Sequence, residues 1–257
     1  MTDGHNAPLM ASLHALLRSQ AERRPDSPAL LAPDCQPIDY SRLFKQVEYT
    51  GRCLAALGIT RADRVAVVLP NGPDMAAAFL GIASHATCAP LNPSYPRDQF
   101  GFYLDDLQAK AIVLPADADT PAREVAGQLG ITIIELEPSS NRPNGAFTLR
   151  GLPADVDAQH ECGGAEDCAL VLHTSGTTSR PKQVPLSQRN LLSSAHAVAR
   201  TLALTGDDRC LNAMPLFHIH GLVGALLSSV YAGGSMVCPE CYEEESFSRA
   251  MGEFSPT

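Results

Sequence analysis

Short apolar runs and stretches of helical periodicity alternate along the first half of the chain. The run Val65–Leu69 (VAVVL) is typical of a strand buried on both faces, and similar runs predict strands over residues 88–91, 111–114 and 131–136. Apolar residues at helical spacing predict helices over residues 9–21, 41–57, 75–86, 96–107 and 122–129, with Ser41 and Asp74 as N-caps and Gly58 as a C-terminal stop. Strands that alternate with helices in this way predict parallel βαβ units and an α/β fold.

The pattern is interrupted near the middle of the chain. Residues 137–167 show no periodicity and are rich in Pro, Ser, Asn and Gly, which predicts a polar loop. Beyond it, apolar runs predict strands over residues 168–172, 210–214 and 235–238. A helix capped by Ser187 is expected to continue to Gly206, a buried helix to span residues 221–232, and a last helix to begin after Ser246.

The most informative segment directly follows the predicted strand 168–172. Residues 172–184 read LHTSGTTSRPKQV, in which Gly176 permits tight turning and Arg180 and Lys182 add positive charge. Hydroxyl side chains stand at Thr174, Ser175, Thr177, Thr178 and Ser179. Hydroxyls, exposed backbone N–H groups and a lysine together suit a polyanion such as a nucleotide phosphate. The spacing is not that of a Walker A loop. The alternative is a Ser/Thr-rich surface loop with a solvated lysine.

A second segment, residues 215–222 (PLFHIHGL), follows at a suitable distance. In this order, the two segments resemble the phosphate-binding and histidine motifs of the AMP-forming acyl-CoA synthetases, the adenylate-forming superfamily. Residues 58–82 and 89–96 also resemble the N-terminal half of these enzymes, so the resemblance covers nearly the whole chain from about Leu13 onward. HTSGTTSRPK together with PLFHIHGL is most similar to the oxalate–CoA ligase subgroup.

The resemblance implies the parallel βαβ layers of the large N-terminal domain of an acyl-CoA synthetase, truncated before that domain is complete. It implies a helical start (1–57) that packs on a second sheet, and a first sheet subdomain (58–210) with the phosphate loop at 173–183. Residues 211–257 would begin the second sheet. The rest of that sheet and a mobile C-terminal lid domain are expected beyond Thr257. Whether this end is an artificial boundary, a gene fragment or one part of a split enzyme stays open.

Enzymes of this superfamily join a carboxylate to the α-phosphate of ATP, release pyrophosphate and transfer the acyl group to the thiol of CoA. The resemblance implies that residues 174–179 bind the β- and γ-phosphates, and that Thr178 is also a Mg²⁺ ligand. Lys182 is expected to bind the nucleotide and to offset charge as pyrophosphate forms. His218 is expected beside the reacting carboxylate, in the acyl and pantetheine pocket, whereas for His220 a core position is favoured. The expected ligands are ATP, Mg²⁺, CoA and a small carboxylic acid, with oxalate or a short- or medium-chain acid as candidates.

Three further residues bear on this interpretation. Gln183 stands where the family usually has glycine after the lysine; at positive φ, a side chain there would cost on the order of 1 kcal/mol. His173 is expected to pack beside the loop. Asp106 is not expected to form half of a catalytic pair with its neighbour Asp105, because adjacent helical positions point in different directions.

Three functions remain open. The first is the N-terminal part of a ligase, inactive as an isolated chain. The second is a non-catalytic nucleotide-binding fragment or a degenerate ligase. A phosphatase or NTPase is a distant third, since no catalytic base is apparent beside the loop.

Composition narrows the function classes. The 257 residues carry a net charge of −9, which argues against non-specific binding to nucleic acid. No segment approaches the roughly 20 apolar residues of a membrane span, and the N-terminus lacks the features of a signal peptide, so we expect a cytoplasmic protein. The eight cysteines are scattered. Cys238 and Cys241 have C-x-x-C spacing but lack two further ligands at suitable positions, so buried or incidental thiols are favoured over a metal site.

Overall fold

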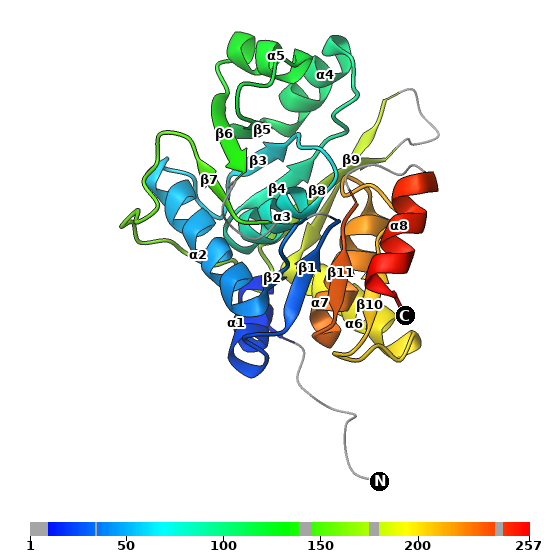
Figure 1. The fold of residues 1–257 in the computed structure, drawn as a ribbon. Coiled ribbons are helices and arrows are strands. Elements are labelled where there is room, and N and C mark those ends of the chain that lie inside the picture. Colours follow the sequence, from blue (N-terminus) through cyan, green and yellow to red (C-terminus); the bar gives the residue numbers. More distant parts are fainter. Residues whose placement is uncertain (1–9, 34, 139–144, 175–179, 240–243) are drawn as a thin grey trace.

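Two sheets organise the chain (Figure 1), which the computed structural model describes over residues 10–33, 35–138, 145–174, 180–239 and 244–257. The larger sheet has seven strands in the order β7-β6-β5-β3-β4-β8-β9. The five strands from β6 to β8 in this order are parallel neighbours, whereas β7 and β9 run antiparallel at the two edges. Its strands are β3 (Arg64–Val67), β4 (Thr87–Pro90), β5 (Ala111–Pro115), β6 (Thr132–Pro138), β7 (Phe147–Leu149), β8 (Cys168–Thr174) and β9 (Lys182–Ser187).

The smaller sheet joins the start of the chain to residues 209–237. Its four strands have the order β10-β11-β1-β2. Strand β11 is parallel to both β1 and β10, and β2 is antiparallel to β1. The strands are β1 (Pro28–Leu31), β2 (Ile38–Asp39), β10 (Arg209–Leu211) and β11 (Ser235–Val237).

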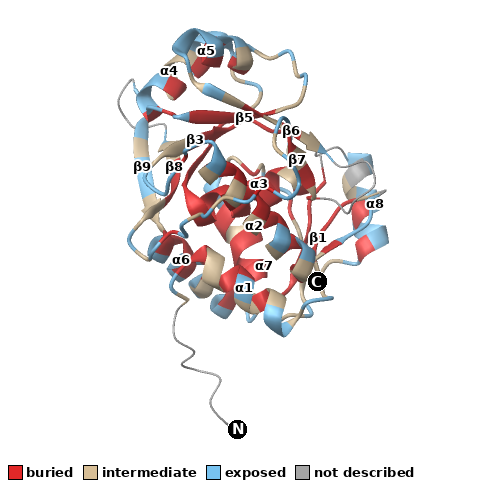
Figure 2. Ribbon diagram, turned by 90° about the vertical axis from the view of Figure 1, so that its left-hand side faces the viewer, coloured by how far each residue is buried: buried red, intermediate tan, exposed pale blue. Residues whose placement is uncertain are grey.

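Helices fill the space between the sheets and cover their outer faces (Figures 1 and 2). One hydrophobic core joins both sheets to the helices between them. These are α1 (Leu13–Arg23), α2 (Tyr40–Ala56), α3 (Pro73–His85), α6 (Gln188–Thr201), the π-helical η1 (His220–Leu227) and α7 (Ser228–Ala232). A second core lies under α4 (Arg97–Leu107) and α5 (Pro121–Leu129), on the other face of the larger sheet. Helix α8 (Glu244–Phe254) packs on the outer face of the smaller sheet.

The central strand β3 shows why the apolar runs form the interior. Val65 and Val67 point into the core between the sheets, whereas Ala66 and Val68, the residue just after the strand, belong to the core beneath α4 and α5. Successive side chains of a strand face opposite ways, so a continuous apolar run is needed where both faces are covered. The predicted α/β fold with parallel βαβ layers is therefore confirmed. The division into 1–57, 58–210 and 211–257 stays a prediction.

Two helix starts differ from the sequence-based expectation. The side chain of Asp39, not Ser41, caps α2, because it accepts a hydrogen bond from the Arg42 N–H at 2.7 Å. Helix α3 begins at Pro73, and Gly72 is its N-cap. Asp74 lies in the first turn and accepts a hydrogen bond from the Gly145 N–H at 3.0 Å. At α2 two cap-type residues, Asp39 and Ser41, stand two positions apart and the first makes the cap, whereas at α3 the Asp74 carboxylate is engaged in a long-range contact with Gly145.

Later in the chain, Ser187 caps α6 as predicted, in a reciprocal capping box with Asn190. The helix ends at Thr201 and not at Gly206, and Ala203 takes the left-handed conformation (φ 54°) that a glycine was expected to supply. The edge strands β7 and β9 were not predicted. None of the helices in the described ranges has both the length and the apolar character needed to cross a lipid bilayer.

Candidate active site

The predicted phosphate loop connects the two strands of a β-hairpin. Strands β8 and β9 pair antiparallel, with His173 opposite Gln183 and Thr174 opposite Lys182. Thr174 and Lys182 are both exposed, so the last cross-strand pair before the loop presents a hydroxyl and an ammonium group to solvent. Lys182 has no ion-pair partner within the described part of the chain, which leaves its charge available to a ligand. The predicted residues Ser175, Gly176, Thr177, Thr178 and Ser179 lie outside the described residues.

A polar network fixes the base of this hairpin to α4. His173 Nε2 donates a hydrogen bond to the Asp106 carboxylate (Oδ2) at 2.8 Å, and the Gln183 side-chain amide donates to the same oxygen at 2.8 Å. The Gln183 amide also donates to the Asp106 backbone carbonyl at 2.5 Å and accepts a hydrogen bond from the Arg64 guanidinium at 3.1 Å. The hydrogen bonds from His173 and Gln183 hold the pKa of Asp106 below its ordinary value, so this anchor is ionised at neutral pH.

Gln183 therefore has a structural reason to replace the usual glycine. It lies in β9 and is absent from the residues with positive φ, so the strain that such a conformation would impose does not arise. Its side chain instead links β9 to α4 and, through Arg64, to β3. His173 packs beside the loop base as predicted, with its ring centroid 4.7 Å from that of Tyr103. Asp106, to which the sequence motifs assign no role, is the common acceptor of this network.

The histidine motif connects β10 to η1. Leu216 is buried, whereas His218, Ile219 and His220 are exposed. The predicted core position of His220 is therefore wrong, because the backbone turns at Pro215, whose carbonyl accepts the His218 N–H at 3.1 Å, and presents both imidazoles outward. A Cβ atom on Gly221 would lie only 2.5 Å from the Pro215 carbonyl oxygen, so this close approach requires glycine.

Asn71 and α6 connect this motif to the rest of the site. The Leu216 N–H donates to Asn71 Oδ1 at 3.0 Å, and Asn71 Nδ2 donates to the Pro239 carbonyl at 2.9 Å. Helix α6 packs against β8 and β9 on one side and against η1 on the other. The hairpin and the histidine motif therefore share a supporting helix, although no hydrogen bond joins Lys182 to His218 among the described residues.

The residues present fit a polyanionic ligand. The hairpin carries an exposed lysine and a hydroxyl next to its loop, on a framework that is hydrogen-bonded to α4 and β3. An exposed cation held on a rigid element is suited to neutralise phosphate oxygens. The loop follows the carboxyl end of β8, one of the parallel strands of the larger sheet. In open α/β sheets, ligands bind outside the carboxyl ends of the strands.

Layered α/β folds of this kind, with a hydroxyl-rich loop between β8 and β9, are those of the adenylate-forming enzymes. A sequence model of the AMP-binding enzyme family matches residues 17–257, and the chain belongs to that family.

Curated relatives and solved structures agree with this assignment. The chain is 35% identical to an oxalate–CoA ligase of Arabidopsis thaliana over 249 residues, which is 96% of this chain and 46% of the relative. It is 36% identical to an oxalate–CoA ligase of Saccharomyces cerevisiae over 74% of this chain and 39% of the relative. The crystal structure of apo MatB from Rhodopseudomonas palustris superposes with a TM-score of 0.79 at 25% identity, covering 94% of this chain and 47% of MatB. The chain thus spans about half the length of the curated relatives it matches.

Proposed function

We propose that this chain supplies the nucleotide-binding part of an ATP-dependent, AMP-forming carboxylic acid–CoA ligase. The observation that carries the proposal is the exposed Thr174–Lys182 pair on a hairpin that is anchored to α4 and β3. Family membership and the CoA-ligase names of the relatives support the reaction class.

Each predicted residue has a role in this reaction. Residues 174–179 bind the β- and γ-phosphates of ATP, and Lys182 offsets the negative charge that shifts to pyrophosphate when a carboxylate attacks the α-phosphate. Thr178 contributes its hydroxyl to Mg²⁺, which neutralises phosphate charge when bound. His218, exposed two residues before η1 begins, faces the acid and the incoming CoA thiol. The products are an acyl-adenylate and pyrophosphate, and then an acyl-CoA and AMP.

Oxalate is the first acid to test, and sulfoacetate is the second. Relatives with these names are 35% and 32% identical to this chain. Both acids carry a second anionic group besides the reacting carboxylate. The exposed imidazoles of His218 and His220 are hydrogen-bond donors that suit such a group.

Binding of MgATP to the 257-residue chain tests the first half of this proposal. The matched variants are Lys182→Ala and Lys45→Ala, which each remove one exposed lysine. We expect saturable binding in calorimetry for the native chain and for Lys45→Ala. For Lys182→Ala we expect affinity to fall at least tenfold, because removal of a charge-assisted phosphate contact costs about 1.5–3 kcal/mol. Equal affinities of the two variants would contradict the role of Lys182.

Isotope exchange between ATP and pyrophosphate tests the catalytic half. We expect no exchange by the chain alone, and oxalate-dependent exchange after fusion to the remaining portion of the Arabidopsis relative. Binding without exchange in the fusion, with any acid, would favour the non-catalytic nucleotide-binding module.

A further inference from the structure

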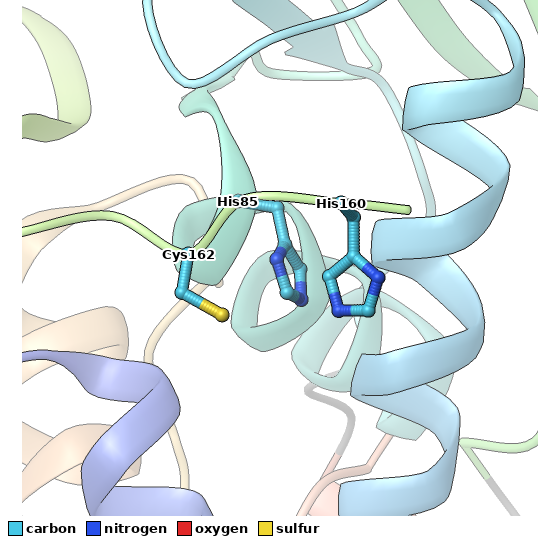
Figure 3. A group of neighbouring side chains, drawn as sticks. All are labelled: His85, His160 and Cys162. Carbon is cyan, nitrogen blue, oxygen red and sulfur yellow. The ribbon is translucent and has the colours of Figure 1, made fainter. Parts of the chain in front are cut away.

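Three potential metal ligands meet on the side of the molecule formed by α2 and α3 (Figure 3). His85 is the last residue of α3, and His160 and Cys162 belong to the segment that leads into β8. One donor atom from each residue lies within 4.8 Å of the other two. None of them belongs to either motif of the proposed nucleotide site, so a metal site at this position is independent of the proposed function.

The orientation of His85 is fixed by its backbone contact. His85 Nδ1 lies 3.1 Å from the Glu161 carbonyl oxygen, which can only accept a hydrogen bond, so Nδ1 carries the proton and Nε2 carries a lone pair. His85 is only 3% exposed, and its Nε2 atom is buried with no hydrogen-bond partner among the described residues. A metal-ligating histidine is typically held in this way, with one nitrogen donating to a carbonyl and the other facing the ion.

The same contact leaves the second ring nitrogen available. Because the Glu161 carbonyl holds the proton on Nδ1, the lone pair of the neutral imidazole is at Nε2. A buried acceptor without a partner is unfavourable, and a coordinated ion would supply the missing partner.

A carboxylate, that of Glu48, lies next to the three candidate ligands. Glu48 Oε1, from α2, lies 2.6 Å from His14 Nε2 and 3.6 Å from His160 Nε2. The rings of His85 and His160 are in edge contact, with centroids 4.7 Å apart. The carboxylate of Glu48 supplies negative charge next to the candidate ligands, and this favours a cation.

Helix α2 leaves room for both imidazoles at Gly51. A Cβ atom at this position would lie 2.6 Å from His85 Nε2 and 2.8 Å from His160 Cδ2. A cavity of about 250 Å³, lined by Gly51, His85 and His160 among others, opens beside them and admits solvent. Arg61 also lines this cavity, but its charge is offset by ion pairs with Glu161 at 3.2 Å and Asp167 at 2.8 Å.

We propose that His85, His160 and Cys162 form a Zn²⁺ site, with the fourth position taken by water from the cavity. Two imidazoles and a thiolate are ligands that Zn²⁺ prefers over Mg²⁺ or Ca²⁺. Zinc–ligand bonds of about 2.0–2.3 Å bring neighbouring donors to roughly 3.5 Å from one another. The present atoms therefore have to close by about 1 Å, and the exposed side chain of Cys162 has the freedom to do so.

The ion would join the end of α3 to the segment before β8. Cysteine binds metals as the thiolate. Binding of Zn²⁺ therefore releases the thiol proton of Cys162 to solvent and forms the Zn–S bond, with no change of oxidation state. The Gly163 N–H already donates to the Ser84 carbonyl at 2.9 Å, so the metal would strengthen an existing junction.

Titration of the metal-free chain with Zn²⁺, and with Co²⁺ as a spectroscopic probe, tests the site. We expect one ion per chain, d–d absorption of a tetrahedral Co²⁺ centre and a thiolate-to-cobalt charge-transfer band. Cys162→Ser should remove the charge-transfer band, and both Cys162→Ser and His160→Asn should weaken Zn²⁺ binding more than about 100-fold, beyond the range seen for outer-sphere partners.

Two control variants separate this site from the other thiols. Cys35→Ser changes an exposed cysteine elsewhere on the surface, and Cys241→Ser removes one thiol of the C-x-x-C sequence. Both should bind one ion with native affinity and spectrum, and circular-dichroism melts should show that all four variants are folded. The proposal is overturned by binding that survives Cys162→Ser, by binding that is lost in Cys241→Ser, or by the absence of saturable binding to the folded native chain.

Discussion

Two largely buried histidines occupy opposite chemical situations in this molecule. His173 lies within the phosphate-loop motif, and its Nε2 is committed to the ionised carboxylate of Asp106. His85 lies outside every motif, and its Nε2 is buried and has no hydrogen-bond partner in the described part of the chain. The contrast shows that a histidine within a sequence motif can have its ring nitrogen already hydrogen-bonded, whereas one outside the motifs can have a ring nitrogen with no partner. In the first region the histidine supports the hairpin of the proposed nucleotide site, and in the second its Nε2 atom has no hydrogen-bond partner among the described residues and is available to the proposed ion.

The largest effect is expected from filling the space that α2 leaves for His85. Gly51→Ala puts a methyl group 2.6 Å from His85 Nε2, so the buried ring has to move, and overpacking of this kind costs about 1–3 kcal/mol. Gly101→Ala is the matched control, because its Cβ in α4 meets nothing within 4 Å. It should be neutral or stabilise by about 0.5–1 kcal/mol through helix propensity. Urea unfolding measures both, and equal midpoints would show that Gly51 is not required for packing.

A smaller effect is expected at the hairpin base. Gln183→Gly restores the residue usual in the family, yet it removes the hydrogen bonds to Asp106 and from Arg64 and adds backbone freedom within a strand. We expect a loss of about 1–2 kcal/mol in the free energy of unfolding, roughly 0.5 kcal/mol or more beyond Gln183→Ala. Urea unfolding of the three chains measures this difference. A Gln183→Gly variant as stable as the native chain would mean that the network contributes nothing.

The smallest effect concerns the charge of Asp106. Its side chain is 37% exposed, so Asp106→Asn should cost about 0.5–1 kcal/mol at neutral pH, after allowance for solvent screening. Because the folded pKa is lowered, this contribution is present above the unfolded value of about 3.9 and is lost as pH falls through the folded pKa. The stability difference from the native chain should therefore vanish in acid. Asp105→Asn, its neighbour on α4, is the control, and a gap that persists in acid would refute an electrostatic origin.

Much of the fold could be predicted because strands that are buried on both faces consist of continuous apolar runs. In strand β3, Val65 and Val67 face one core and Ala66 faces the other, and all three are apolar. The edge strands could not be found in this way. Strand β9 contains Pro185 and mixes exposed with half-buried positions, and β7 has only three residues within a stretch rich in turn-forming side chains. Strands β7 and β9 are strands because they pair antiparallel with β6 and β8, and this pairing is not visible in the local sequence.

The two histidine regions were predictable to different degrees. The loop residues and Lys182 belong to a local motif, and the sequence indicates where the hairpin lies. The partner of His173 cannot be found from that motif, because Asp106 belongs to a helix far away in the chain. The cluster of His85, His160 and Cys162 has no local signature at all. Its donors come from α3 and from a segment without periodicity, and backbone contacts between that segment and the end of α3, such as the Gly163 N–H to the Ser84 carbonyl, bring them together.

Asn71 has a mechanical consequence for the whole domain. It follows β3, the central strand of the larger sheet, and its amide holds the Leu216 N–H with one end and the Pro239 carbonyl with the other. Pro239 follows β11 of the smaller sheet, so the carboxyl ends of strands from two separate sheets share a single side chain. A displacement of one strand end relative to the other would have to stretch or break one of these two hydrogen bonds. Asn71 thus ties the segment that bears His218 to the carboxyl ends of strands from both sheets.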